Sequence, residues 1–236
     1  MPWSLILAWL VHLYTALGVA IAFIAVLSIE QGDFRSAFFL MGLAVVLDAT
    51  DGTLARAARV KEVLPWFDGD ALDGIVDYFN YVIVPVLLLY RAGLLPTDDA
   101  LWIAMLPLLA SAYGFSQKNA KTADHFFLGF PSYWNIVVFY LYVLKSPVWL
   151  NAFIVIALSA LVFVPMKYIY PSRSPRFRIQ TNAFGAVWAV CVLYMIYLLP
   201  DAPRGLVFAS LAFPAYYTAL SLWLEYLRLS QSSPRG

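Results

Sequence analysis

The segment from Leu47 to Phe79 reads LDATDGTLARAARVKEVLPWFDGDALDGIVDYF, and it places four aspartates inside or at the edges of apolar stretches. They are Asp48, Asp51, Asp73 and Asp77. A carboxylate at membrane depth costs roughly 2.5 to 3.5 kcal/mol on insertion scales, so four in one region require a compensating cation and a function. The segment therefore indicates a metal site inside a membrane protein.

The composition of the whole chain is that of an integral membrane protein. Of its 236 residues, 63% are hydrophobic and 12% are charged, and several apolar runs approach the ~20 residues that span a bilayer. The first run, from Trp3 to Ile29, has no basic leader and no small-residue cleavage site, so we expect a retained helix rather than a signal peptide. The formal net charge of +1 lacks the basic excess that is typical of nucleic-acid-binding proteins.

Apolar runs separated by helix breakers predict an all-α polytopic bundle of about eight transmembrane helices. The spans are expected near 3 to 29, 36 to 54, 71 to 91, 99 to 117, 131 to 145, 148 to 167, 182 to 199 and 205 to 227. The longest polar stretch is only a connecting loop, so residues 1–236 are interpreted as one integral membrane domain.

Basic residues are distributed unequally between alternate loops. Of the fifteen Lys and Arg residues, four lie on one side, namely Arg35, Arg91, Lys145 and Arg204, and the remaining eleven lie on the other. Positive charge is retained on the cytoplasmic side of a membrane protein. Both termini and the aspartate segment are therefore predicted to face the cytoplasm.

The first two aspartates share one face of a predicted helix with three further residues. Asp48, Asp51, Gly52, Ala55 and Arg56 lie at i, i+3, i+4, i+7 and i+8. Gly52 and Ala55 remove side-chain bulk, so a diphosphate or nucleotide could approach the backbone closely. Arg56 would supply a planar, permanently charged donor to a phosphate or to a ligand aspartate. A buried ion pair of Asp51 with Arg56 is the alternative, and it does not explain the whole pattern.

A second predicted helix face carries the other two aspartates. Gly69, Asp73 and Asp77 lie at i, i+4 and i+8. Like charges four residues apart repel, and two such faces opposed in a low dielectric need a divalent cation between them. All-oxygen carboxylate ligands suit Mg²⁺ and Mn²⁺, and a two-metal cluster is one arrangement that uses four carboxylates. Such ions bind phosphate oxygens.

The combined string resembles the signature of the CDP-alcohol phosphotransferases. It reads Asp48-x-x-Asp51-Gly52-x-x-Ala55-Arg56, followed by Gly69-x-x-x-Asp73-x-x-x-Asp77. One departure is visible, because twelve residues separate Arg56 from Gly69, a longer gap than is usual in that family. The insertion includes Trp66 and Phe67. The resemblance implies the helical membrane fold of that family, and it leaves the geometry of this loop open.

Three further stretches narrow the resemblance to the bacterial phosphatidylcholine synthases. They are AWLVHLYTALG at 8–18, VKEVLPWFDGDALDGIVDY at 60–78 and AKTADHFFLGFPSYWN at 120–135. The resemblance implies transfer of a phosphatidyl group from CDP-diacylglycerol to choline, with release of CMP, by a homodimer in the bacterial inner membrane. It also implies that Asp48, Asp51 and Asp73 bind the metal ions with Asp77 beside them. Asp77 is in addition the implied general base toward the acceptor hydroxyl.

Choline would require aromatic side chains, because its quaternary ammonium offers no hydrogen bond. Each cation-π contact is worth roughly 0.5 to 2 kcal/mol. The preferred candidates are Trp66, Tyr78 and Trp134, against the alternative of lipid-facing packing or an interfacial aromatic belt. Arg173, in the basic loop 170–178, is a candidate for the lipid phosphates. That loop could equally anchor the chain to anionic headgroups, at about 1 kcal/mol per charge.

Other functions remain open at this point. A related enzyme could use another alcohol acceptor, or could transfer phosphocholine from CDP-choline to diacylglycerol. Both remain open because the carboxylate motif recognises the CDP part of the substrate and not the alcohol. A transporter with intramembrane acidic residues is the non-enzymatic alternative. It predicts discontinuous helices and repeat-like symmetry, neither of which the sequence displays.

Overall fold

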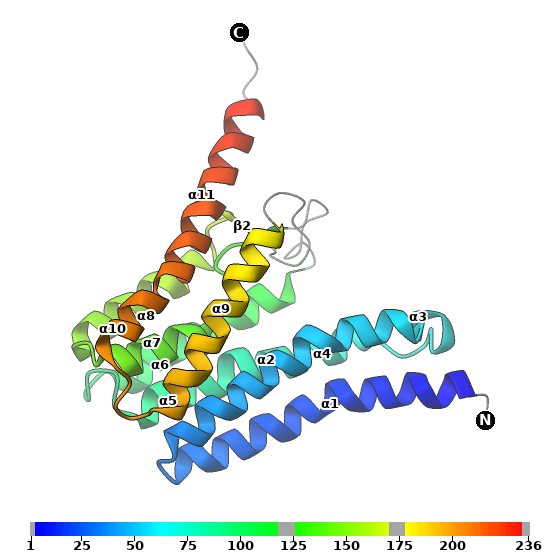
Figure 1. Cartoon of the computed structure of the whole chain (residues 1–236), viewed down its shortest axis with the longest axis horizontal. Helices are drawn as coiled ribbons and strands as arrows, with labels where there is room; N and C mark the ends of the chain where they lie inside the picture. Colours follow the sequence, from blue (N-terminus) through cyan, green and yellow to red (C-terminus); the bar gives the residue numbers. More distant parts are fainter. Residues whose placement is uncertain (1–2, 118–125, 170–177, 233–236) are drawn as a thin grey trace.

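The structure is a computed structural model that describes residues 3–117, 126–169 and 178–232 (Figure 1). Its helices are α1 (Trp3–Glu30), α2 (Phe34–Ala57), α3 (Val60–Val63), α4 (Gly69–Tyr78), the π-helix η1 (Phe79–Ile83), α5 (Val84–Arg91), α6 (Ala100–Ser116), α7 (Trp134–Leu144), α8 (Val148–Leu161), α9 (Arg178–Tyr197), α10 (Arg204–Ser210) and α11 (Ala212–Ser232). Two short strands, β1 (Phe126–Leu128) and β2 (Lys167–Ile169), pair antiparallel.

Eight apolar helical segments in the described ranges correspond to the eight predicted spans, but α8 ends at Leu161, so the predicted span 148–167 was too long and its last residue begins β2. Five are long and apolar enough to cross a membrane, namely Trp3–Glu30, Phe34–Ala57, Gly69–Arg91, Ile179–Tyr197 and Arg204–Tyr226. The other three, α6, α7 and α8, are apolar but shorter. The prediction of a polytopic helical membrane bundle is confirmed, and the chain is a multi-pass membrane protein.

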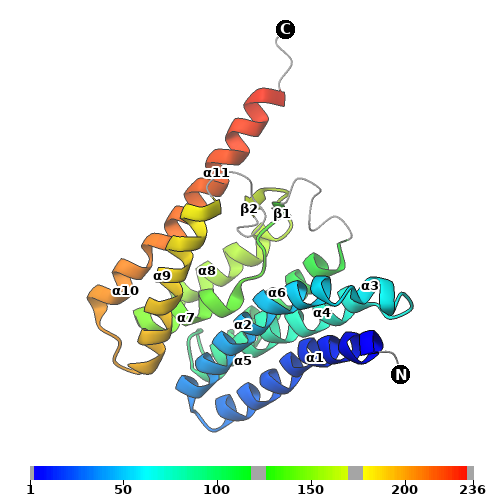
Figure 2. The ribbon, with the colours of Figure 1, turned by 45° about the vertical axis from the view of Figure 1, so that its right-hand side comes forward.

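Small residues bring α1 and α2 together along most of their length. Ala8, Ala22 and Ala25 of α1 are buried, as are Ala37 and Ala44 of α2. Small side chains let the backbones of membrane helices approach closely, which replaces the hydrophobic driving force that is missing in lipid. The two helices run side by side in both views of the ribbon, with α4 next to them (Figures 1 and 2).

The turn between α1 and α2 is closed by an N-cap. The Asp33 carboxylate accepts a hydrogen bond of 3.0 Å from the Ser36 backbone N–H. This contact satisfies one of the backbone donors that a helix leaves unpaired at its start. Hydrogen bonds from Ser36 also hold the pKa of the Asp33 carboxyl below its usual value.

The longer gap before Gly69 is folded rather than open. It contains α3 and a turn, and Val60 and Leu64 are buried against Ala8 and Val11 of α1. The insertion therefore extends the arm formed by α1, α2 and α4, and it leaves the two aspartate helices in contact with α1. This resolves the loop geometry that the sequence left open.

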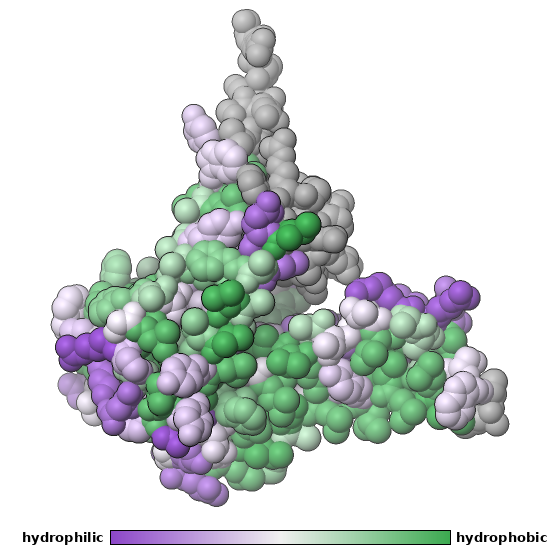
Figure 3. All heavy atoms as spheres, viewed as in Figure 1, coloured by the Kyte–Doolittle hydropathy of each residue, from purple (hydrophilic) through white to green (hydrophobic). Residues whose placement is uncertain are grey.

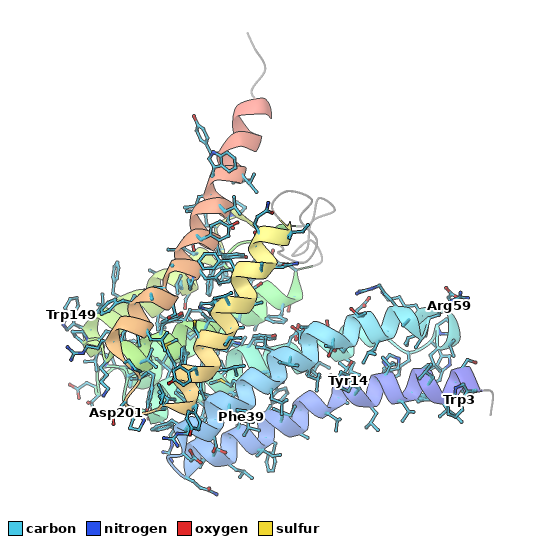
Figure 4. The ribbon with its side chains drawn as sticks, in the orientation of Figure 1. Trp3, Tyr14, Phe39, Arg59, Trp149 and Asp201 are labelled. Atoms are coloured by element: carbon cyan, nitrogen blue, oxygen red, sulfur yellow. The ribbon has the colours of Figure 1, made fainter. Side chains whose placement is uncertain are left out.

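Polar contacts join the turns at the end of the bundle opposite α3. Arg91 pairs with Glu30, Lys145 pairs with Asp201, and Arg35 donates to the Leu199 carbonyl. Figure 4 labels Asp201 near this end, and Arg59 and Trp3 at the other. Three of the four basic residues assigned to the minority side thus lie together, which agrees with the alternation inferred from the sequence.

The surface of the molecule is largely apolar. Leu13, Phe23, Phe39, Leu109 and Phe153 are among the many large hydrophobic side chains that lie exposed. The space-filling view shows mainly apolar colour along the middle of the α1–α2 arm and over much of α9 (Figure 3). Such a surface suits helices that face lipid.

Candidate metal and active site

The geometry brings three of the four predicted ligands into one cluster. Asp48 of α2 and Asp73 and Asp77 of α4 each offer a carboxylate oxygen, and these three oxygens lie within 4.8 Å of one another. All three residues are partly buried. The helix-face argument therefore placed these side chains correctly.

This donor set fits a divalent cation. Oxygens that bind one Mg²⁺ at about 2.0 to 2.1 Å lie at most about 4.2 Å apart. A separation of up to 4.8 Å needs only a small contraction to reach that value. Three carboxylates without a cation would also repel strongly in a medium of low dielectric. The acidic triad could hold a metal ion.

Asp51, the fourth predicted ligand, is not part of this cluster of three. It is buried, and its Oδ2 accepts a hydrogen bond of 2.9 Å from Thr15 Oγ1 of α1. One residue before Thr15, the Tyr14 hydroxyl lies 2.8 Å from Thr50 Oγ1 of α2. Tyr14 is labelled in Figure 4, between α1 and α2. Helix α1 thus supports the aspartate helix without contributing a carboxylate.

Tyr81 belongs to this site, and sequence reasoning considered it only as one of several aromatic residues near the aspartates, not as a partner of Asp48. Its hydroxyl donates a hydrogen bond of 2.7 Å to Asp48 Oδ2, which joins η1 to α2. A signal was present, because Tyr81 continues the four-residue spacing of Gly69, Asp73 and Asp77. That spacing was used for the carboxylates alone.

Gly69 lies where α1 packs closely against the start of α4. A Cβ at Gly69 would come within 2.8 Å of His12 Cε1, and one at Gly18 would come within 2.3 Å of Val76 Cγ1. Both glycines permit the close approach that sets the position of Asp73. The buried Nε2 of His12 has no hydrogen-bond partner within the described part of the chain.

Gly52, Ala55 and Arg56 lie beyond the cluster, toward the α3 end of α2. A Cβ at Gly52 would meet only the Arg56 Nη1 atom, at an ordinary 3.4 Å, so packing does not explain the glycine. The exposed Arg56 guanidinium donates to Thr53 Oγ1 at 3.0 Å. Ala55 packs against the small core that α1 and α3 form, so the open room beside the Arg56 guanidinium lies at Gly52. The role of this face toward a nucleotide stays a prediction.

The three aromatic candidates for choline lie in different environments. Trp66 is 72% exposed in the turn before α4, and its ring centroid is 5.7 Å from that of Trp9. Tyr78 is half-buried and donates to the Leu108 carbonyl at 2.8 Å. Trp134, the first residue of α7, is fully buried and donates to Ser111 Oγ, so choline cannot reach its ring in this structure. Arg173 lies outside the described residues.

An apolar groove runs between α2, α7 and α9. Its lining includes Gly42, Val45 and Val46 of α2 together with Leu193 of α9, and Val45 lies three residues, about one helical turn, before Asp48. The Trp188 indole at its wall donates its N–H to the Tyr140 hydroxyl rather than into the groove. The groove therefore offers hydrocarbon contacts about one turn of α2 away from Asp48.

The chain is similar over nearly its whole length to curated proteins that share one description. It is 40% identical over 226 residues to a phosphatidylcholine synthase of Legionella pneumophila, which covers 93% of this chain and 89% of the relative. It is 38% identical to one of Pseudomonas aeruginosa (92% and 91%) and 35% identical to one of Rhizobium meliloti (95% and 93%). No family model matches the chain.

Proposed function

Because this chain belongs to the phosphatidylcholine synthase family, we propose that it transfers the phosphatidyl group of CDP-diacylglycerol to choline. The choline oxygen forms a bond to the phosphorus that carries diacylglycerol, and the bond from that phosphorus to CMP breaks. The observation that carries this proposal is the convergence of Asp48, Asp73 and Asp77 at the edge of an apolar bundle.

The carboxylates are proposed to hold two Mg²⁺ or Mn²⁺ ions, with Asp48, Asp51, Asp73 and Asp77 as ligands. When bound, such ions would neutralise diphosphate charge and polarise a nearby hydroxyl. Asp77 is proposed to accept the hydroxyl proton of choline. The fit of three carboxylate oxygens to one cation supports this assignment.

The nucleotide is proposed to lie over the small residues of α2 and the start of α4. Gly52 leaves the backbone accessible there, and Gly69 begins α4. The exposed Arg56 guanidinium would reach a phosphate, because its planar group carries several donors. The close packing of α1 against Gly69 supports a fixed position for the start of α4 beside the proposed nucleotide site.

The lipid and the acceptor are proposed to arrive from different sides. One acyl chain of CDP-diacylglycerol would lie in the apolar groove beside Asp48. Choline would meet the exposed face of Trp66 or the ring of Tyr78, whereas the fully buried Trp134 is the least accessible candidate. Arg173 keeps its proposed role toward lipid phosphates.

The remaining proposals concern the cell and the assembly. We infer a location in the bacterial inner membrane with the carboxylates and both termini on the cytoplasmic side, because eleven of fifteen basic residues fall on that side. The functional unit is proposed to be a homodimer. The partners would be CDP-diacylglycerol, choline, CMP and membrane lipids.

The deciding experiment is release of labelled CMP by the purified protein with Mn²⁺. Release from CDP-diacylglycerol that depends on choline, and not on serine, inositol, ethanolamine or glycerol 3-phosphate, is the expected result. Release with another alcohol only, or from CDP-choline with diacylglycerol, would reassign the reaction. Solute uptake into vesicles without CMP release would favour the transporter alternative.

A further inference from the structure

We propose that Tyr81 is a positioning residue whose hydroxyl holds the Asp48 carboxylate in the orientation required for metal binding. The proposal deepens the function assigned above and rests on it. It starts from one contact, the 2.7 Å hydrogen bond from the Tyr81 hydroxyl to Asp48 Oδ2.

The length and chemistry of this contact give it strength. Hydrogen bonds from a hydroxyl to a carboxylate are charge-assisted and typically about 2.5 to 2.7 Å long. The hydroxyl occupies one lone pair of Oδ2, so the carboxylate is held in one orientation while its remaining lone pairs are left for a cation. Outer partners of this kind orient metal ligands throughout proteins.

The π-helix explains how Tyr81 reaches α2. Tyr81 lies in η1, a single π-helical turn that directly follows the helix of Asp73 and Asp77. Such turns are rare and occur frequently at functional sites, because the extra residue re-aims the side chains that follow. Here one continuous helical segment supplies two of the clustered carboxylates, and also the hydroxyl that contacts the third.

The widened turn is itself fixed to its surroundings. Asn80, which is buried, donates its side-chain N–H groups to the Gly18 carbonyl of α1 and to the Val76 carbonyl, both at 3.0 Å. Tyr81 is partly buried and packs against the main hydrophobic core. The hydroxyl therefore has a defined position, as a group that orients a ligand must have.

A purely structural hydrogen bond would stabilise the bundle without changing cation affinity. The two roles are separated by Tyr81→Phe, which keeps the ring and removes the donor. Tyr140→Phe is the matched control, because that buried tyrosine loses a hydroxyl that donates to Ser210 and accepts from the Trp188 indole, away from the carboxylates. Both variants are compared with wild type for thermal stability in detergent without metal.

The main readout is Mn²⁺ affinity without substrates, measured from the magnetic resonance signal of free Mn²⁺. We expect Tyr81→Phe to weaken binding roughly 10- to 100-fold, the range found for outer partners of metal ligands. Tyr140→Phe should leave Mn²⁺ affinity within about twofold. In turnover, the Mn²⁺ concentration for half-activation should rise in Tyr81→Phe, and saturating Mn²⁺ should restore most of kcat.

A double-mutant cycle ties the effect to Asp48. Adding Tyr81→Phe to Asp48→Asn should change Mn²⁺ affinity no further, because the oriented carboxylate is already gone. If Tyr81→Phe does not fold, Tyr81→Gln, which keeps a donor, is compared with Tyr81→Leu, which does not. Higher Mn²⁺ affinity in the Gln variant supports the proposal, and equal affinity overturns it.

The outcomes distinguish this inference from the proposed function. If wild type binds no Mn²⁺ and Mg²⁺ does not support turnover, the metal site itself is wrong. If wild type binds Mn²⁺ and Tyr81→Phe binds it equally well, the site stands and the positioning role of Tyr81 is overturned.

Discussion

Asp77 and Asp70 both belong to α4, but only Asp77 reaches the carboxylate cluster. Asp70 is exposed and pairs with Lys61 at 2.7 Å. Asp70 is therefore a matched control for Asp77, because both are aspartates of α4. Comparing the two substitutions separates the effect of removing one negative charge from α4 from the effect of removing the proposed base.

Asp77→Asn is expected to lower kcat by about 10²- to 10⁴-fold, the usual contribution of a general base. CDP-diacylglycerol should still stabilise the variant in a thermal shift assay in detergent, because Asp48 and Asp73 remain. Asp70→Asn should retain turnover close to that of wild type. Near-native kcat in Asp77→Asn would remove Asp77 from the mechanism.

Trp66→Ala and Tyr78→Ala are expected to raise the KM for choline far more than the KM for CDP-diacylglycerol. Loss of one cation-π contact of about 0.5 to 2 kcal/mol corresponds to roughly a 2- to 30-fold change. Tyr78→Phe should retain much of the affinity, because it keeps the ring face. Trp149→Ala is the control, since Trp149 is exposed near the opposite end of the bundle (Figure 4). Unchanged choline constants would exclude both aromatic residues.

For single residues, the sequence predicted how the charged side chains cluster, but it did not predict which aromatic side chains are buried by packing. The convergence of Asp48, Asp73 and Asp77 followed from their spacing and from the cost of carboxylates in lipid. The burial of Trp134 did not, because aromatic residues serve equally well in cores and at membrane interfaces. Only the partners around a ring decide between these two uses.

Two helix starts on the same side of the bundle allow a test of capping. Asp33 caps α2 through its carboxylate, whereas Asp99 occupies the N-cap position of α6 without a side-chain hydrogen bond. Asp33→Ala should lower the free energy of unfolding by about 1 kcal/mol near neutral pH. Asp99→Ala should change it much less, and both values follow from unfolding in mixed detergent.

The pH dependence of this effect has a defined sign. The folded pKa of Asp33 is lowered by its hydrogen bonds with Ser36, so its stabilisation is present above the unfolded pKa of about 3.9. The stabilisation is lost as the pH falls through the lower, folded value. The difference between wild type and Asp33→Ala should therefore shrink below about pH 4. A difference that grew on acidification would contradict the cap.

Among the secondary-structure elements, the long apolar helices were predictable from the sequence, but the π-helix and the two short strands were not. Runs of apolar residues located the five helices that are long enough to cross a membrane and the three shorter apolar helices, because lipid requires continuous apolar helix. The π-helix at Phe79–Ile83 adds a residue to one turn, which leaves the apolar pattern unchanged. The strands β1 and β2 have three residues each, too few for an alternating pattern to be recognised.

Helix α2 meets α7 and α9 at the apolar groove, so the groove joins parts of the chain that are distant in sequence. Gly42 of α2 faces Leu193 of α9 there, and a Cβ at Gly42 would lie 3.7 Å from Leu193 Cδ2. Alanine therefore fits at this position, whereas leucine would occupy the groove. The proposed acyl-chain site thus depends on contacts between segments about 150 residues apart, which local sequence patterns do not reveal.

Gly42→Leu is expected to raise the KM for long-chain CDP-diacylglycerol much more than that for a short-chain analogue. Displacing two buried methylenes at ~0.8 kcal/mol each corresponds to about a 15-fold change. Gly42→Ala should have a small effect, and Gly205→Leu, which adds the same bulk in open space on α10, is the control. Equal changes for both chain lengths would show that the groove holds no acyl chain.

All four proposed metal ligands precede Arg91 in the sequence, and this position has a consequence for how the protein is inserted and assembled. Helices α1, α2 and the α4–α5 segment can enter the bilayer and associate while the rest of the chain is still on the ribosome, since chains fold from the N-terminus as they are made. The acidic centre can then assemble before α9 closes the groove. Each nascent molecule would acquire its cation first and its lipid-binding surface last.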